Sequence, residues 1–397
     1  MSAAPFAGGP YRGIPICVLV ALFEGLDIQS MGVAAPRVAS AFHFGPGEMG
    51  ILMSSSTLGL MIGAAWGGWL SDRVGRKAVI VASMAALGLF SLATALASNF
   101  YFLLAARVLA GLGLGGVFPN LIALVSEITP RPHRVTALGL MYCGLPLGGA
   151  SAGVAMSAGS SADWQLIFYI GGIGPLLLVF LLLVFLPDSN NQVAPDDSVA
   201  VREPLMGLFG TRTASTLLLW TSYFFTLLAV YLLLNWLPSL LVAKGYSRTQ
   251  GSTCAVILNI GAIAGSLLLG RLSDGGYPKS ILVATYSGML AALVALATAE
   301  GSALFLSAFF AGFFVIGGQL VLYAIAPALY PMAFRGTGVG AAVAVGRVGS
   351  VAGPLLAGSL LAHGFEPGTI PVAAAPGLLI ALVAVLMLIL RQDKLGA

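Results

Sequence analysis

The sequence predicts an all-α membrane protein with twelve transmembrane helices, arranged as two pseudo-symmetric six-helix bundles. Composition is the first observation behind this prediction: 58% of the 397 residues are hydrophobic and 8% are charged, whereas soluble domains have about 25% charged residues. The second observation is a series of apolar segments, each long enough to cross a bilayer as a helix. The third is a set of motifs from the first half of the chain that recur in the second half.

The twelve predicted spans are joined by short connections. We place them at residues 14–35, 49–70, 77–97, 102–126, 135–157, 166–186, 214–237, 251–271, 280–299, 302–328, 337–361 and 369–390. They are too long to be strands, and an open sheet would leave backbone groups unpaired in lipid. We expect tails at 1–13 and 391–397 and a polar linker at 187–213, so that the two bundles span 14–186 and 214–390.

The distribution of Lys and Arg predicts the orientation of the chain. With the N-terminus inside, thirteen of the 18 basic residues fall in cytoplasmic segments, three fall in outer loops (Arg37, Lys244 and Arg248), and two lie inside spans (Arg107 and Arg347). Cytoplasmic loops of membrane proteins have an excess of Lys and Arg. We therefore expect both termini in the cytoplasm.

The internal repeat is visible in two motifs. Residues 68–72, Gly-Trp-Leu-Ser-Asp, recur as Gly-Arg-Leu-Ser-Asp at 270–274, an offset of 202. The pattern Arg-x-Thr-x-x-Gly at 134–139 recurs at 335–340, an offset of 201. A duplication in parallel orientation is typical of secondary transporters.

Two acids in the first span are the candidate proton-coupling groups. Glu24 and Asp27 are three residues apart, so they share one face of a helix. An ionised acid near the middle of a spanning helix costs about 2.5–3.5 kcal/mol unless it faces water, pairs with a cation or takes up a proton. No histidine lies deep in a span, so carboxylates are the available proton carriers. The alternative is a fixed ion pair with Arg107, and an ion pair that exchanges partners would combine both roles.

The two arginines inside spans have no counterpart in the other half. Arg107 in the fourth span corresponds to Ala308, and Arg347 in the eleventh corresponds to Pro146. We expect Arg107 to be the partner of an acid in the first span, in preference to direct substrate contact. We expect Arg347, whose nearest acid in sequence is Glu366, to bind the carboxylate of an anionic substrate. The alternative for Arg347 is a structural pair with an acid from another span.

Polar and aromatic residues inside spans are candidates for the walls of a substrate site. Such sites combine apolar surfaces with a few convergent polar groups, and tyrosine supplies both. For each of these residues an ordinary packing or interface role is the competing interpretation. The candidates are Tyr142, Tyr231, Asn235, Gln319 and Tyr323.

Several motifs resemble those of a known family. Residues 68–77 look like the loop signature between spans two and three of the major facilitator superfamily, and 107–116 resemble its span-four signature. The sequence Glu24-Gly-Leu-Asp27 is similar to the Asp-Gly-x-Asp motif of the aromatic acid/proton symporter family, with a departure at the first acid. Further similarity to the hydroxyphenylpropionate transporter branch lies at 32–36, 119–124, 141–144, 235–238 and 342–347. The resemblance implies the fold, symport with protons and an aromatic carboxylate substrate.

The same resemblance implies a gate on the cytoplasmic side. In the family, the loop after the second span acts as a latch that pairs across the two halves. The alternative interpretations are positive-inside anchoring for the basic residues and a solvated helix end for Glu127. The gating candidates are Asp72, Arg73, Arg76, Glu127, Asp274 and Arg335.

We therefore expect a secondary transporter in the inner membrane of a bacterium that imports an aromatic carboxylate with protons by alternating access. It would act as a monomer and use the proton gradient, with no cofactor, metal or nucleic-acid partner. One alternative is a proton-coupled exporter of drugs or metabolites, although residues 144–149 depart from the Gly-Pro-x-x-Gly-Gly motif of exporters. A second is a non-transporting sensor, although both tails are short. An enzyme is not expected, because no nucleophile–base or metal constellation appears.

Overall fold

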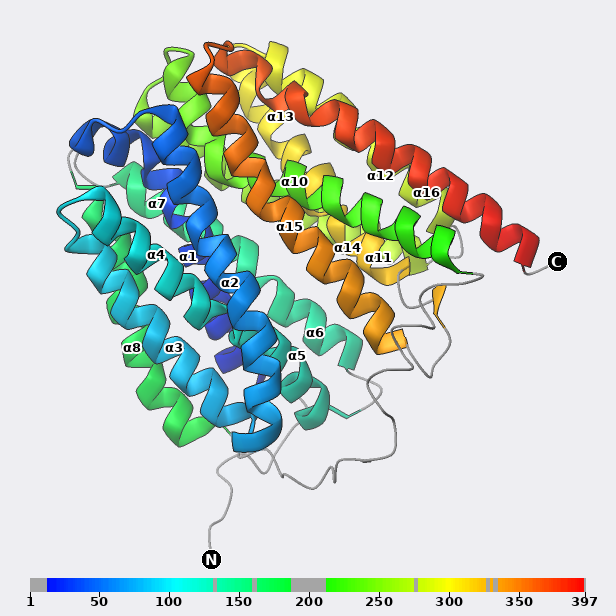
Figure 1. The fold of residues 1–397 in the computed structure, drawn as a ribbon, viewed down its shortest axis with the longest axis horizontal. Coiled ribbons are helices and arrows are strands. Elements are labelled where there is room, and N and C mark those ends of the chain that lie inside the picture. The colour runs from blue at the N-terminus through cyan, green and yellow to red at the C-terminus, as the bar shows by residue number, and fades with distance from the viewer. Residues whose placement is uncertain are drawn as a thin grey trace, which may run out of the picture. The chain divides into compact units, whose positions relative to one another are not determined.

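The computed structural model describes residues 13–130, 134–158, 163–186, 212–274, 278–325, 329–330 and 335–395. All regular structure in these ranges is helical, and 11 helices are long and apolar enough to cross a membrane. Helix α2 (Pro46–Val74) covers the remaining predicted span. The predicted all-α membrane fold is thus confirmed (Figure 1).

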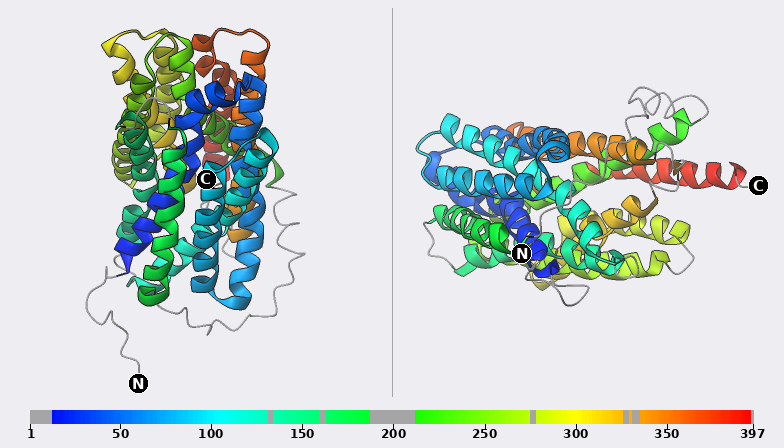
Figure 2. Two further views of the ribbon diagram at one scale, coloured as in Figure 1. Left: turned by 90° about the vertical axis from the view of Figure 1, so that its left-hand side faces the viewer. Right: turned by 90° about the horizontal axis from the view of Figure 1, so that it is seen from below.

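The chain divides into two compact units. The first is Met1–Ala194 with Arg248–Val256, and the second is Pro195–Ser247 with Ile257–Ala397. Most of the predicted linker at 187–213 lies outside the described residues, so its boundaries stay a prediction. Within each unit the long helices run side by side (Figure 2).

The first unit contains eight helical segments that make up six predicted spans. They are α1 (Ile14–Phe42), α2, α3 (Arg76–Ala95), α4 (Phe100–Gly115), α5 (Val117–Ile128), α6 (Arg134–Tyr142), α7 (Gly144–Ala158) and α8 (Gln165–Phe185). The break between α2 and α3 is at Gly75, whose φ of 88° is a backbone conformation that favours glycine. Asn99 begins α4 as its N-cap, because its side chain accepts a hydrogen bond from the Phe102 amide at 2.9 Å.

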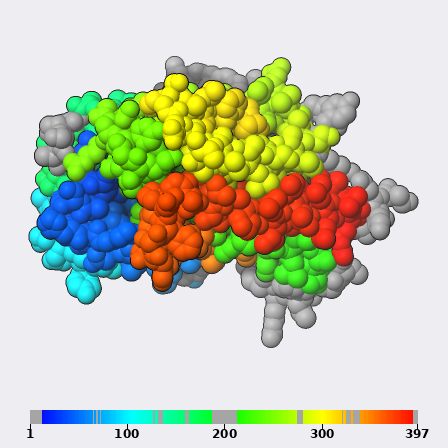
Figure 3. Space-filling model, turned by 90° about the horizontal axis from the view of Figure 1, so that it is seen from above, coloured from blue at the N-terminus to red at the C-terminus, as the bar shows by residue number. Residues whose placement is uncertain are grey.

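Most of the second half of the chain forms the second unit. Its elements are α10 (Thr213–Ala243), α11 (Arg248–Asp274, whose first residues belong to the first unit), α12 (Pro278–Thr298), α13 (Ser302–Ala311), the π-helix η2 (Gly312–Ile316), α14 (Gln319–Ile325), α15 (Arg335–Ala362), the 3₁₀ turns η5 (Pro367–Thr369) and η6 (Pro371–Ala374), and α16 (Ala375–Leu395). Figure 3 shows α16 as a ridge, in red, between α12 and α10. Its exposed side chains include Leu379, Ile380, Val383 and Met387, as expected for a helix against lipid.

Glycines allow the helices to pack with their backbones in close approach. A Cβ atom at Gly111 of α4 would lie 1.9 Å from the Ser56 carbonyl oxygen of α2. At the matching place in the second unit, a Cβ atom at Gly312 would lie 1.8 Å from the Leu258 carbonyl oxygen. Small residues at helix contacts are the usual means of close packing in membranes. The duplicated sequence therefore folds twice into the same helix contact.

Three predicted spans are interrupted in their interior, a feature that the sequence prediction did not address. The fourth is broken at Gly116, the fifth at Cys143, and the tenth passes through η2 between α13 and α14. At the first break, the side chain of Asn120 donates hydrogen bonds to the carbonyls of Gly116 (2.8 Å) and Gly67 (3.3 Å). Breaks are tolerated at membrane depth when neighbouring groups satisfy the freed carbonyls in this way.

The prediction for Arg37 also needs correction. Helix α1 continues past Pro36 to Phe42, so Arg37 lies within a helix and not in an outer loop. Its side chain is buried and donates to the carbonyl of Met156 in the last turn of α7, at 2.9 Å. A cation at this position compensates the unpaired carbonyls of a helix C-terminus.

Candidate functional site

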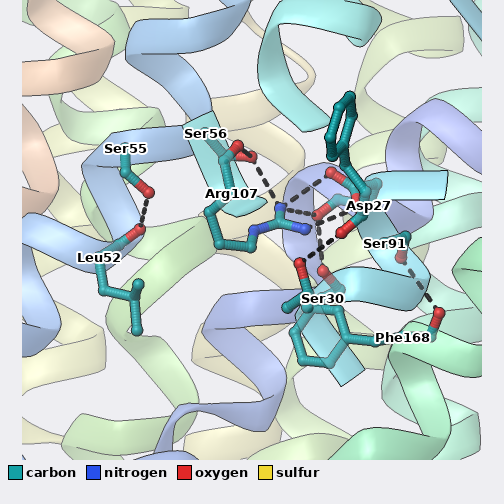
Figure 4. A network of polar contacts seen from close by, with 10 residues as sticks. Asp27, Ser30, Leu52, Ser55, Ser56, Ser91, Arg107 and Phe168 are labelled. Atoms are coloured by element: carbon teal, nitrogen blue, oxygen red, sulfur yellow. Dashed lines mark hydrogen bonds and ion pairs between the residues drawn. The ribbon is translucent and has the colours of Figure 1, made fainter. Parts of the chain in front are cut away.

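A buried ion pair lies at the centre of the first unit. Asp27 of α1 and Arg107 of α4 form a two-pronged contact, with both N–O distances at 2.9 Å. Their side chains are 1% and 0% exposed. One nitrogen of Arg107 also donates to the Asp27 carbonyl at 3.3 Å and to the Ser56 hydroxyl of α2 at 2.8 Å (Figure 4).

The surroundings of the pair compensate much of the cost of burying two charges. The Ser56 hydroxyl donates in turn to the Arg107 carbonyl at 3.2 Å, and the ring of Phe168 from α8 lies 5.5 Å from the guanidinium carbon. A buried ion pair is tolerated when its geometry is good and its remaining polar atoms have partners. The Nε atom of Arg107 is buried with no hydrogen-bond partner in the part of the chain that the structure describes. The two buried charges are therefore well compensated, but one polar atom of the pair still lacks a hydrogen bond.

Glu24 lies one turn before Asp27 on α1 and is 2% exposed. Among the described residues, the hydrogen bonds of the Arg107 side chain go to Asp27 and Ser56 and not to Glu24. The two predicted acids thus have different environments. The structure brings Asp27 and Arg107 together, while the proton-coupling roles of all three residues stay predictions.

Sequence reasoning missed Ser56 and Phe168. Ser56 had a usable signal: it lies in a Ser-Ser-Ser-Thr run inside an apolar span, and its counterpart at an offset of 202 is Leu258. A departure from the repeat was the argument for Arg107, and it applies equally to Ser56. Phe168 had no such signal, because an aromatic residue in an apolar helix is ordinary.

A second polar cluster lies in the second unit, where α10, α14 and α15 contribute to it. Arg347 of α15 is half-buried, and its guanidinium donates to the Tyr231 hydroxyl of α10 at 2.7 Å. The Gln319 amide donates to the Tyr323 hydroxyl one turn later on α14. The ring of Tyr323 lies 5.3 Å from that of Tyr223. The structure thus brings together four of the six predicted substrate-binding residues.

The charge balance of this cluster differs from that of the first unit. The sequences of α10 and α14 contain no charged residue, and the charged residues of α15 are two arginines, Arg335 and Arg347. The side-chain charge that these three helices bring to the cluster is therefore positive, at Arg347. A guanidinium group is suited to bind an anionic ligand.

The other two predicted substrate-binding residues are placed differently. Asn235 is buried and its amide donates to the Tyr231 carbonyl of its own helix at 2.8 Å, so it supports α10 near the cluster. Tyr142 belongs to the first unit, where its ring contacts that of Phe118 at 5.0 Å. Their roles in binding substrate stay predictions.

The predicted gating residues lie at helix ends. Arg73 is exposed and Arg76 is half-buried, on either side of the Gly75 turn. The side chains of four others fall outside the described residues: Asp72, Glu127, Asp274 and Arg335. No cluster of three or more potential metal ligands occurs among the residues that the structure describes.

Comparison with known proteins decides the family. The sequence profile of the Major Facilitator Superfamily matches residues 17–301 and 219–396. The chain belongs to this superfamily. It is therefore a membrane transporter, and the predictions of the family and of a non-enzymatic function are confirmed.

Two relatives and one solved structure illustrate the similarity. The chain is 48% identical over 384 residues to the 3-(3-hydroxy-phenyl)propionate transporter of Escherichia coli (strain K12), with 96% of this chain and 94% of that one covered. It is 32% identical over 400 residues to the 4-hydroxybenzoate transporter PcaK of Pseudomonas aeruginosa, with 92% and 89% covered. The crystal structure of a D-xylose-proton symporter matches with a TM-score of 0.78 at 19% identity, over 95% of this chain and 97% of that one, and supports the fold alone.

Proposed function

We propose that the protein is a secondary active transporter that imports an aromatic carboxylate together with protons across a bacterial inner membrane. The observation that carries the proposal is the Arg347–Tyr231 contact at 2.7 Å, which places a guanidinium group and a phenol side by side in the second unit. The 48% identity to a transporter named for 3-(3-hydroxy-phenyl)propionate supports the same substrate class.

The cluster has the chemistry that an aromatic carboxylate requires. A guanidinium group binds a carboxylate through two parallel hydrogen bonds. The Tyr231 hydroxyl accepts a hydrogen bond from Arg347, so its own proton is available to a second carboxylate oxygen. Tyr231 and Tyr323 offer aromatic surface for the ring of the substrate, and Tyr323 packs in turn against the buried Tyr223.

The first unit would handle the protons. Arg107 compensates the charge of Asp27 with two hydrogen bonds. Glu24 lies on the same face of α1, is buried, and receives no hydrogen bond from Arg107 within the described residues. Burial disfavours the ionised form of a carboxyl group. We therefore assign the transported proton to Glu24, and we expect the Asp27–Arg107 pair to stay ionised beside it.

Alternating access would connect the two sites to each side of the membrane in turn, with both termini in the cytoplasm. Protonation from the outer side and binding of the anion at Arg347 would precede the conformational change. Release of both inside would reset the carrier.

The test is uptake of labelled 3-(3-hydroxyphenyl)propionate into proteoliposomes, with and without an imposed inward proton gradient. Accumulation that depends on the gradient and is reduced by competing aromatic acids is the expected result. Equal uptake without a gradient would show that transport is not coupled to protons, and would contradict the role assigned to Glu24. Absence of uptake in both cases, with a panel of aromatic acids as well, would contradict the proposed substrate class.

A further inference from the structure

The Gln319–Tyr323 pair on α14 has a donor and an acceptor that its own hydrogen bond does not use. The Gln319 amide nitrogen donates to the Tyr323 hydroxyl oxygen. The hydroxyl proton of Tyr323 and the amide oxygen of Gln319 form no hydrogen bond with any other described residue. One turn of α14 therefore presents one donor and one acceptor next to each other.

The position of this pair links it to the carboxylate site. Val343, one turn before Arg347 on α15, belongs to the same hydrophobic cluster as Tyr223 and Tyr323. The ring of Tyr323 packs against Tyr223, which is fully buried and fixes its orientation. The Arg347–Tyr231 contact and the Gln319–Tyr323 pair are therefore neighbouring parts of one cluster in the second unit.

The chemistry of the pair does not match a carboxylate. An ionised carboxylate only accepts hydrogen bonds, so the amide oxygen of Gln319 would repel it. A phenolic hydroxyl both donates and accepts. It would donate its proton to the Gln319 oxygen and accept the proton of Tyr323, which leaves no polar atom of the pair unmatched.

We propose that Gln319 and Tyr323 form the subsite that recognises a hydroxyl group on the ring of the substrate, while Arg347 and Tyr231 bind its carboxylate. This inference rests on the proposed function and narrows its substrate class to hydroxylated aromatic acids. A site with paired hydrogen-bonding groups rejects an analogue that lacks the hydroxyl, because the groups of the site are then left unpaired.

The experiment compares two acids that differ by one hydroxyl, 3-(3-hydroxyphenyl)propionate and 3-phenylpropionate, in proteoliposome uptake. The variants are Gln319→Leu and Tyr323→Phe, each of which removes one member of the pair. The control is Tyr286→Phe, which deletes a buried hydroxyl elsewhere in the second unit, hydrogen-bonded to Thr226 at 2.8 Å. A third acid, 3-(3-methoxyphenyl)propionate, can accept a hydrogen bond at the ring but cannot donate one.

For the wild-type protein we expect a KM about tenfold lower for the hydroxylated acid than for 3-phenylpropionate. Both variants should raise the KM of the hydroxylated acid to about that of 3-phenylpropionate, whose own KM stays unchanged and shows that the variants fold. Tyr286→Phe should keep the ratio of the two values. The methoxy acid should lose affinity with Tyr323→Phe but not with Gln319→Leu.

Two results would overturn the inference. One is an equal loss for both acids in the variants, since a group that only shapes the site would act in this way. The other is a wild-type protein that transports both acids with the same KM. Failure of the wild-type protein to transport either acid is a different result, because it would contradict the proposed function itself.

Discussion

The two units share a helix-packing scheme but differ in the charges placed on it. In the first unit Asp27, Arg107 and Ser56 form a buried polar network. Their counterparts in the second unit are Ala229, Ala308 and Leu258, all of them fully buried and apolar. The same contact between the second and fourth spans of each unit exists with and without the network, so the fold does not require these charges.

The second unit likewise has a charged residue whose counterpart in the first unit is uncharged. Arg347 has Pro146 as its counterpart in the first unit. Burying charged groups costs free energy that apolar residues would not cost. The comparison teaches that each unit has its own charged groups on a common scaffold: two acids and an arginine in the first unit, and Arg347 in the second. In the proposed function, the charged groups of the first unit handle protons and Arg347 of the second unit binds the carboxylate of the substrate.

The strongest way to break the comparison is to remove half of the ion pair. We expect Arg107→Ala to leave the buried Asp27 uncompensated and to lower the free energy of unfolding by about 3–5 kcal/mol. The double variant Asp27→Ala with Arg107→Ala reproduces the residues of the second unit and should recover most of that stability. Thermal unfolding in detergent measures both, and an equally unstable double variant would contradict the view that the scaffold tolerates apolar residues here.

Removal of the cation of the second unit should act on transport and not on folding. We expect Arg347→Gln to raise the KM for an aromatic carboxylate by about 100-fold, the loss of a charge-assisted contact worth about 3 kcal/mol. Concentration-dependent uptake measures this effect, with thermal unfolding as the control. An unchanged KM would exclude Arg347 from carboxylate binding.

Matched glycine substitutions would test whether the two units are packed alike. Gly111→Ala and Gly312→Ala each place a methyl group within 2 Å of a carbonyl oxygen on the neighbouring helix. We expect each to destabilise the protein by about 1–3 kcal/mol, and by similar amounts. A large effect in one unit and none in the other would show that the helix contact is not equivalent.

The smallest expected effect concerns the break in the fourth span. Asn120 satisfies the Gly116 carbonyl and reaches the Gly67 carbonyl of α2, whereas its counterpart is the apolar Val321. Asn120→Ala should cost about 1 kcal/mol of stability, and Val321→Ala serves as the matched control for loss of side-chain volume. A loss no greater for Asn120→Ala than for the control would remove the proposed role of the amide.

The fold could be predicted because its signals are local and repeated. Apolar segments of spanning length and two offsets that agree to one residue are enough to infer twelve helices in two halves. Helix breaks could not be predicted, because Gly116 and Cys143 resemble the many small residues that continue a membrane helix without interruption. The sequence predicts an acid of the first span as the partner of Arg107, and the structure shows that it is Asp27. The choice of Asp27 over Glu24 depends on how α1, α2, α4 and α8 converge, which the spacing along the chain does not specify.

The most direct test of the central claim is a comparison of two transport modes in two variants. Gradient-driven accumulation and gradient-free exchange of labelled 3-(3-hydroxyphenyl)propionate would be measured for Glu24→Gln and Arg347→Gln. The account predicts that Glu24→Gln keeps exchange and loses accumulation, while Arg347→Gln weakens both through its higher KM. If Glu24→Gln loses exchange as well as accumulation, or still accumulates substrate against a gradient, or if Arg347→Gln keeps both modes with an unchanged KM, the division of roles between the two units is wrong.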